Sequence, residues 1–362
     1  MFLERKYIER KMYKMIKSVI GVVGIEIDEN YKWKDTLFID DTISSKDEQV
    51  YNKCLGFIKV IYKEKINYED ARKIEENIWG NERYIYDRKK EAKVYFEKQN
   101  VCVIETKQEV NEWLVMMLQI MLLKNGYSFI HAAGVSKNNK AIVLPSWGGV
   151  GKTACVSKLV RSGYRLLGDD LNIITAEGKI YGFPKKFVLY FYHKNLFPEV
   201  FDKKAPKCNA TLNKFYNSII PTVKRCLRVF PAVLAFFRKH NPQSMKVSPA
   251  EIFGKESLEK QSEIKQAIWI ERTKNKNYFK QLENIKLAQK ALSVTINEIF
   301  NESISMIFIM CGLGIIEYKE VFGNMEKIYE KAFEEVISEN LEVSTDKKVE
   351  VVADEVMKNI KI

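Results

Sequence analysis

The chain has 362 residues, enough for two domains or for one large domain with an accessory lobe. Hydrophobic residues make up 46% and aromatic residues 12% of the sequence, which excludes an intrinsically disordered protein. The formal net charge is +12, but Lys is interleaved with Glu along the chain. An ordinary solvated surface accounts for this pattern, so nucleic acid is not favoured as the main ligand.

The cysteines and the apolar segments indicate a cytoplasmic protein. The six Cys are scattered without a C-x-x-C pair, and the three His offer no zinc-site spacing. The apolar runs at 114–123 and 303–316 are shorter than the ~20 residues that cross a bilayer. We therefore expect no transmembrane segment, and no secretory signal stands out.

Residues 1–108 are expected to form a smaller β-rich domain, accessory or substrate-binding. Short β-prone runs separated by turn-prone stretches favour an antiparallel sheet, with one helix inserted at 68–78. No group of residues in this part suggests chemistry. The β-prone runs are 19–27, 37–39, 56–62, 84–86, 94–96 and 101–104.

A buried apolar helix is predicted over 109–124, with Asn111 as a candidate cap and Gly126 at its end. Two apolar runs, 127–135 and 141–145, then flank a tetrapeptide with two Asn, which predicts a β-hairpin. The second run leads directly into a glycine-rich loop. Helical spacing follows at 153–161, and strands are expected at 165–168, 171–175 and 179–183.

Residues 109–290 are interpreted as one core, with a helical insertion at about 202–263. Within the insertion, 221–239 mixes basic and aromatic residues. A helical pair packed on the core, a lid, a partner-docking helix and a membrane-surface element are the alternatives for it. A strand is expected at 267–271. The last part, 291–362, is expected to be mostly helical, to contain a late strand at 348–352 and to complete the core.

The loop 146–153 reads Ser-Trp-Gly-Gly-Val-Gly-Lys-Thr, which matches the Walker A pattern of a P-loop except for Ser at the first position. Its glycines allow the backbone angles of an anion nest, and the helix that follows adds its N-terminal dipole. Lys152 would neutralise the β- and γ-phosphates of a nucleotide, and the Thr153 hydroxyl would bind Mg²⁺. The predicted nucleotide-binding residues are Ser146, Gly148, Gly149, Val150, Gly151, Lys152 and Thr153.

Asp169 and Asp170 follow the short strand at 165–168, close to the loop along the chain. Neighbouring strand residues point to opposite faces, so one carboxylate could face the phosphates, where it would hold Mg²⁺ or accept a hydroxyl proton. A turn or helix-cap role is the alternative for the pair. His131, expected on the hairpin partner of the strand that enters the loop, could polarise a substrate or orient an Asp, or be structural.

Together these features resemble the catalytic core of HPr kinase/phosphorylase and its related kinases. That core contains a His near the end of a strand, a short hairpin, a P-loop, a helix with a basic, glycine-containing end, and an acidic pair. The matching parts here are His131, the loop 146–153, the segment 158–167 and Asp169-Asp170. Segments 179–185 and 247–254 also look like the related kinases.

The resemblance implies an α/β fold: a P-loop core with a mixed sheet, similar to the nucleotide core of phosphoenolpyruvate carboxykinase. It implies ATP or another nucleoside triphosphate together with Mg²⁺. One of Asp169 and Asp170 would be the general base for a Ser hydroxyl and the other would lie near the metal; we assign Thr153 and Asp169 to the metal. Lys152 and His131 complete the predicted catalytic set.

The chain departs from HPr kinase itself. Ser146 and Gly148 stand where that enzyme's loop usually has Gly and Ser. The glycine-rich segment that should follow the acidic pair is missing, and the segment 311–316 is similar to it only superficially. The N-terminal residues show no clear match to that enzyme's N-terminal domain, so HPr is not the expected substrate.

We therefore expect an ATP- and Mg²⁺-dependent kinase that phosphorylates a hydroxyl of a peptide, a protein or a small molecule. The main alternative is a P-loop NTPase that acts as a nucleotide-dependent regulatory or binding module. A third reading, an NTPase that works on nucleic acid, is supported by charge alone. Lys185, Lys186 and Arg272 could add positive charge at the phosphates. The acceptor, the nucleotide base and a homo-oligomeric state stay open.

Overall fold

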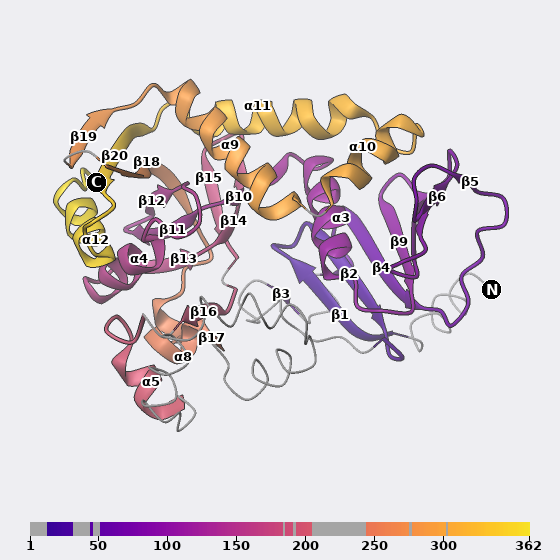
Figure 1. Cartoon of the computed structure of the whole chain (residues 1–362), viewed down its shortest axis with the longest axis horizontal. Helices are drawn as coiled ribbons and strands as arrows, with labels where there is room; N and C mark the ends of the chain where they lie inside the picture. Colours follow the sequence, from indigo (N-terminus) through magenta and orange to yellow (C-terminus); the bar gives the residue numbers. More distant parts are fainter. Residues whose placement is uncertain are drawn as a thin grey trace, which may run out of the picture. The chain divides into compact units, whose positions relative to one another are not determined.

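The computed structural model describes residues 13–31, 44–45, 51–183, 185–190, 193–204, 244–274, 277–301 and 303–362 (Figure 1). The fold is α/β with mixed sheets and several helices, as predicted. The chain divides into one compact unit of residues 1–185 with 256–362 and a second of residues 186–255. The expected strand at 37–39 and the basic-aromatic segment 221–239 lie outside the described residues.

The N-terminal sheet is mixed, so the antiparallel prediction was wrong. Strand β4 (Gly56–Tyr62) is parallel to β2 (Val23–Asp28) on one side and to β9 (Val101–Thr106) on the other. The connections on both sides of β4 are long enough for the crossover that parallel neighbours require. The sheet order is β3 (Ser44–Ser45), β1 (Tyr13–Val19), β2, β4, β9, β8 (Ala92–Lys98), β7 (Tyr84–Asp87), β6 (Ile78–Gly80) and β5 (Arg72–Lys73).

Two local predictions in this part were also wrong. The run at 19–27 is split between β1 and β2 by a turn in which Ile20 and Gly21 have positive φ. The helix expected at 68–78 is absent from the described residues, and β5 and β6 lie there instead. Aromatic packing explains this, because Tyr68 stacks on Tyr86 of β7 with ring centroids 4.1 Å apart. That contact holds the segment before β5 against the sheet.

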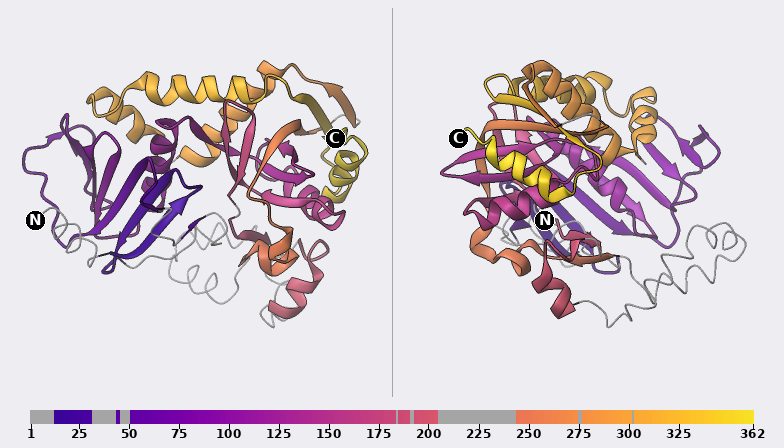
Figure 2. Two further views of the ribbon diagram at one scale, coloured as in Figure 1. Left: turned by 180° about the vertical axis from the view of Figure 1, so that it is seen from behind. Right: turned by 60° about the vertical axis from the view of Figure 1, so that its left-hand side comes forward.

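Helix α3 (Asn111–Leu123) lies beside strands of both large sheets (Figure 1 and Figure 2). Its Trp, Leu, Ile and Met side chains are buried on most of its circumference, as the sequence predicts. Asn111 is the first helical residue and not the cap, which is Val110 without a side-chain bond. Gly126 has φ +83° just beyond the helix, the left-handed conformation that favours glycine at a helix end.

The second sheet carries the glycine-rich loop. Strands β12 (Lys140–Leu144) and β18 (Gln261–Thr273) are parallel, as are β18 and β20 (Ile337–Ser344), while the other neighbours are antiparallel. The predicted hairpin is confirmed: β11 (Ala133–Lys137) pairs with β12, and Asn138 and Asn139 both have positive φ. The order is β10 (Tyr127–His131), β14 (Leu171–Thr175), β15 (Lys179–Gly182), β18, β12, β11 and β13 (Arg165–Gly168), with β20 on β18 and β19 (Tyr278–Gln281) on β20.

Helices cover this sheet. Helix α9 (Asn284–Phe300) contacts β10 and β20, and α11 (Asn324–Ala332) contacts β10 and β14. Helix α4 (Lys152–Arg161) packs on β11 and β13 and also contacts α12 (Val349–Lys358). The π-helical turn η3 (Lys319–Gly323) lies between α10 (Ile304–Gly312) and α11.

The C-terminal strand was predicted in the wrong place. Lys348 is the N-cap of α12 and residues 349–352 form its first turn, because Val352, Ala353 and Val356 recur at helical spacing and are buried. The late strand is β20, whose Ser338, Glu339 and Asn340 are buried although polar. These polar residues interrupt the apolar pattern that would otherwise have marked the strand.

The second unit contains a small antiparallel pair, β16 (Phe187–Tyr190) with β17 (Ser244–Val247). Helices α5 (Pro198–Lys204) and α8 (Pro249–Phe253) and the 3₁₀ turn η2 (Lys255–Ser257), which extends past the unit boundary, complete the described elements of this region. Phe187 packs against Phe197 and Phe253, with ring centroids 6.0 Å apart in both pairs. Only the two ends of the insertion predicted at about 202–263 are therefore described.

Among the described residues, no single helix is long and apolar enough to cross a membrane. The pair α9 and α10, which meets at a bend of 96°, passes the same test of length and composition when taken together.

Replacing Gly182 with Ala should destabilise the fold. A Cβ atom there would lie 2.6 Å from the main-chain oxygen of Glu259 and 2.8 Å from that of Leu167, and these main-chain atoms cannot move aside as a flexible side chain would. We expect the free energy of unfolding to fall by about 1–3 kcal/mol, the usual cost of overpacking. The matched control is Gly312→Ala, where a Cβ meets nothing within 4 Å. Urea unfolding should separate the two variants; equal stabilities would contradict the packing described for β15.

Candidate functional site

The glycine-rich loop joins β12 to α4 in a conformation suited to anions. Gly149 and Gly151 have φ of +77° and +115°, and Val150 between them does not have a positive φ. Such alternation turns successive N–H groups into a concave anion nest. The N–H groups of Gly149, Val150 and Gly151 have no hydrogen-bond partner in the part of the chain that the structure describes. They are available to a ligand beside the N-terminus of α4.

Ser146 holds the start of the loop. Its side-chain oxygen accepts a hydrogen bond of 2.8 Å from the main-chain N–H of Ile270 in β18, and Ser146 is fully buried. The departure from Gly at this position therefore has a structural role, because the hydroxyl ties the loop to the neighbouring parallel strand.

Lys152 folds back over its own loop. Its ammonium donates to the carbonyl oxygens of Ser146 and Trp147, the latter at 2.9 Å, and lies 3.1 Å from Nε2 of His131. Lys152 is only 8% exposed. Burial lowers its pKa, and the negative charges of Asp170 and Asp169 offset part of that effect.

A break in a strand ladder brings His131 and the acidic pair together. Strands β10 and β14 pair up to His131 opposite Leu171, and β11 and β13 pair from Gly134 opposite Gly168. Between these pairs, Asp169 and Asp170 lie opposite Ala132 and Ala133. The ladder opens there, so neither Asp occupies a regular strand position.

His131 was predicted on the hairpin partner of β12, but it ends β10, and Ala132 separates it from the start of that partner, β11. The bend at Ala132 turns the two consecutive strands toward different neighbours. His131 nevertheless reaches Lys152, because the ladder break leaves its side chain beside the loop.

The partners of His131 define its protonation. Burial is the main cause that lowers its pKa to about 4, and the charge of Lys152 adds to the effect. Neutral at physiological pH, the ring accepts from Lys152 at Nε2 and thus carries its proton on Nδ1. Nδ1 lies 3.3 Å from Oδ1 of Asp170, within the distance of an electrostatic contact. A chain of polar contacts thus runs from Lys152 through His131 to Asp170.

The two aspartates differ sharply. Burial would raise the pKa of Asp170, but Lys185, whose Nζ lies 2.7 Å from Oδ2, and His131 outweigh it and lower the pKa to about 2. For Asp169, burial and the neighbouring Asp170 raise the pKa to about 7. Paired acids whose pKa values are driven apart are typical of acid–base sites.

Asp169 is linked to the loop helix through Thr153. The Thr153 hydroxyl donates to Oδ2 of Asp169 at 3.0 Å. Oδ1 of Asp169 is buried and finds no hydrogen-bond partner among the described residues. A buried carboxylate oxygen without a donor is suited to a cation.

Several supporting residues were missed in the sequence. Thr295 of α9 accepts the His131 main-chain N–H at 2.9 Å and the Tyr329 hydroxyl at 2.7 Å. Asn172 donates to the carbonyl of Ala132 at 2.8 Å and so fixes the bend before β11. Glu298 of α9 reaches the main-chain N–H of Gly148. Only contacts between distant segments identify these residues, since none belongs to a local motif.

Of the three basic residues suggested for the phosphates, Lys185, Lys186 and Arg272, each has a different place in the structure. Lys185 is in the site through its bond to Asp170. Arg272 donates to the main-chain oxygens of Thr345 and Lys347 and thus anchors the turn before α12. Lys186 belongs to the second unit.

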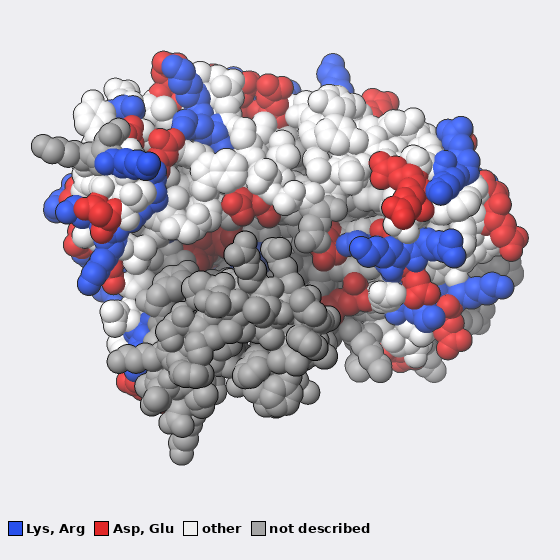
Figure 3. Space-filling view, in the orientation of Figure 1, with Lys and Arg blue, Asp and Glu red and all other residues white. Residues whose placement is uncertain are grey.

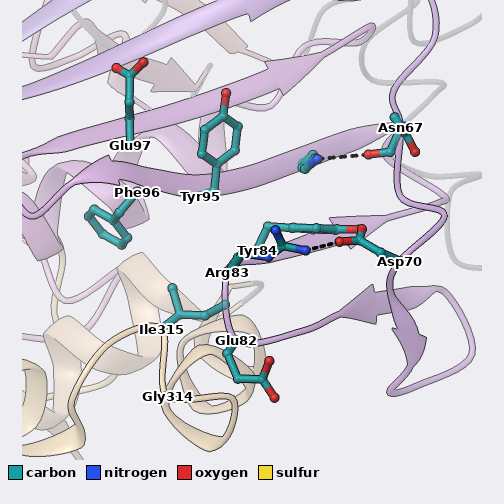
Figure 4. Close-up of a pocket in the computed structure, with 11 residues that line it drawn as sticks. Asn67, Asp70, Glu82, Arg83, Tyr84, Tyr95, Phe96, Glu97, Gly314 and Ile315 are labelled. Atoms are coloured by element: carbon teal, nitrogen blue, oxygen red, sulfur yellow. Dashed lines mark hydrogen bonds and ion pairs between the residues drawn. The ribbon is translucent and has the colours of Figure 1, made fainter.

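The rest of the described surface offers less chemistry. On the face in Figure 3, basic and acidic side chains are interleaved rather than separated, which agrees with the interpretation of the net charge. A hollow of about 630 Å³ lies between the N-terminal sheet and the loop after α10 (Figure 4). Its Asp70 binds Arg83 and Tyr84, and its Lys93 binds the main-chain oxygen of Asn67. Asp70 and Lys93 thus already have partners among the residues that line the hollow.

The raised pKa of Asp169 predicts a pH-dependent cost to stability. The folded state binds more protons than the unfolded state between pH 3.8 and about 7, so the free energy of unfolding falls as pH rises through that window. Asp169→Asn should remove the cost and stabilise the protein by about 1–3 kcal/mol at pH 8, since one pKa unit corresponds to about 1.4 kcal/mol.

Unfolding in urea at pH 8 and at pH 4.5 measures this effect, and the gain should shrink at the lower pH. Asp346→Asn is the control, because that carboxylate is 70% exposed. A gain that is the same at both pH values would show that Asp169 is ionised at little cost.

No protein-family model matches the sequence, and a search of curated proteins also finds no match. The function must therefore be argued from the geometry of the site.

Proposed function

We propose that this protein is an ATP- and Mg²⁺-dependent kinase built on a P-loop core, transferring the γ-phosphate to a hydroxyl of a peptide, a protein or a small molecule. One observation carries the proposal: two sets of polar contacts meet at the glycine-rich loop. One joins Thr153 to Asp169, and the other joins Lys152 through His131 to Asp170. Kinases commonly place one carboxylate on the metal and another beside the acceptor hydroxyl, both near the phosphates.

The loop supports nucleotide binding. Its free N–H groups and the N-terminus of α4 attract phosphate oxygens. The Lys152 ammonium now rests on carbonyl oxygens of the loop, from which a short side-chain movement would carry it to a phosphate. A buried cation that exchanges carbonyl partners for a phosphate gains the stronger, charge-assisted bond.

The metal side fits Mg²⁺. Asp169 and Thr153 would hold the ion, because the unpartnered Oδ1 and the hydroxyl are oxygen ligands of the kind it prefers. Among the described residues there is no cluster of three or more His, Cys, Asp or Glu that could hold a metal. Mg²⁺ usually takes one or two carboxylates and completes its shell with phosphates and water. Bound there, it would neutralise charge on the transferring phosphate.

The acceptor side is assigned to Asp170. The acceptor oxygen would attack the γ-phosphorus while the bond from that phosphorus to the bridging oxygen of ADP breaks, and Asp170 would take the hydroxyl proton. Its low pKa keeps it ionised at neutral pH. His131 and Lys185 hold the two carboxylate oxygens, so they act as positioning residues.

The thiols of Cys102, Cys155 and Cys311 form no disulfide within the part of the chain that the structure describes, which supports a reducing, cytoplasmic setting. The segment 1–108 is proposed as an accessory or substrate-binding part. Nothing in the site selects among peptide, protein and small-molecule acceptors.

Two substitutions test the proposed transfer with γ-labelled ATP. Lys152→Ala should abolish nucleotide binding and transfer, because the phosphates lose their buried cation. Asp170→Asn should lower transfer by about 10²–10⁴-fold, the usual contribution of a general base, with nucleotide affinity kept. Label on a peptide or small molecule encoded or made alongside the protein is the readout.

Lys158→Ala is the matched control, since Lys158 lies on the same helix but pairs with Asp354 on the surface. Release of free phosphate that ignores every acceptor would contradict the kinase and favour a nucleotide-dependent regulatory module. Unchanged transfer in both Asp169→Asn and Asp170→Asn would place the base elsewhere.

A further inference from the structure

We propose that Glu298 makes the glycine-rich loop selective for metal-complexed nucleotide by opposing phosphates that arrive without a cation. Its Oε1 lies 3.4 Å from the main-chain N of Gly148, which donates to it. Both carboxylate oxygens lie close to this residue, since a Cβ on Gly148 would be 3.6 Å from Oε1 and 3.9 Å from Oε2. An anionic side chain thus occupies one edge of the anion nest.

The position of Glu298 is imposed by the core and not by the loop. Ala291, Thr295 and Glu298 lie on one face of α9, because residues three and four apart are neighbours on a helix. Ala291 and Thr295 are fully buried, and the Thr295 hydroxyl is bonded to the main chain of His131 and to Tyr329. One helical turn later, the same face presents Glu298 to the loop.

The negative charge of Glu298 is not neutralised by a described cation, so it can act on a ligand. Glu298 forms no ion pair among the described residues, and the nearby Lys152 is engaged by carbonyl oxygens and His131. A phosphate bound in the nest would compete for the Gly148 N–H and lie within a few ångströms of this carboxylate. Two like charges at about 4 Å repel measurably even at the dielectric constant of water. A divalent cation on the phosphates cancels most of that repulsion.

This inference rests on the proposed nucleotide binding and adds to it the selection of the ligand's form. Glu298 is then a specificity residue, and replacing it should change nucleotide affinity in the direction opposite to the loss of a metal ligand. A metal ligand strengthens binding of the magnesium complex, so its loss weakens that complex. A repelling carboxylate weakens binding of free nucleotide, so its loss strengthens it.

The test is calorimetric titration of the full chain with ATP, once with EDTA and once with excess Mg²⁺, at low salt and pH 8. Glu298→Gln should raise the affinity for metal-free ATP about threefold to tenfold. It should raise the affinity for Mg²⁺-ATP less than about twofold. The gain should shrink as salt is added, because an exposed charge is screened. Glu298→Asp, which withdraws the charge by one methylene, should fall between.

Glu283→Gln is the control, an exposed Glu at the opposite end of α9 that pairs with Lys286. Wild-type protein that binds Mg²⁺-ATP, with metal-free affinity unchanged in Glu298→Gln, would overturn the inference alone. Weaker Mg²⁺-ATP binding in that variant would overturn it too, by making Glu298 a metal ligand. If neither the wild-type protein nor any variant binds ATP under either condition, both this inference and the proposed function are overturned.

Discussion

The candidate site depends on a gap in strand pairing, between the β10–β14 pair and the β11–β13 pair. β10 and β11 run antiparallel to β14 and β13, and the pairing opens where Asp169 and Asp170 face two alanines. In a regular ladder, side chains of adjacent residues would point to opposite faces. The opening frees one Asp to meet Thr153 and the other to meet His131. Asn172 and Thr295 hold the His131–Ala132 side of the opening, by bonds to the Ala132 carbonyl and to the His131 N–H.

The charges follow from the same geometry. Lys152, His131 and Asp170 form a chain in which the middle member is neutral, since burial and Lys152 hold the pKa of His131 at about 4. Asp170 stays ionised beside Lys185, and its charge helps to raise the pKa of Asp169. Two carboxylates with unequal pKa values are thus kept side by side at a cost in stability, as the proposed phosphoryl transfer would use them.

Local patterns predicted the centre of the second sheet well. The Asn pair predicted the hairpin of β11 and β12. Apolar spacing predicted α4, and short apolar runs predicted β13 and β14. Prediction was wrong where packing between distant segments competes with local preference. Tyr68, just before β5, stacks on Tyr86 of β7, and β20 buries Glu339 by bonding it to Gln266 and Lys361. Parallel pairing of β4 likewise depends on neighbours far along the chain.

The sequence by itself determined the loop, its Lys-Thr ending, the helix after it and the acidic pair, because each depends on residues within a few positions of one another. Only the tertiary structure decided that His131 sits on β10 and yet contacts Lys152, and that Lys185 pairs with Asp170. It alone brought Glu298 to the loop, across 150 positions of sequence from Gly148. Periodicity records which face of an element is buried; which elements then meet is decided by the packing of the whole core.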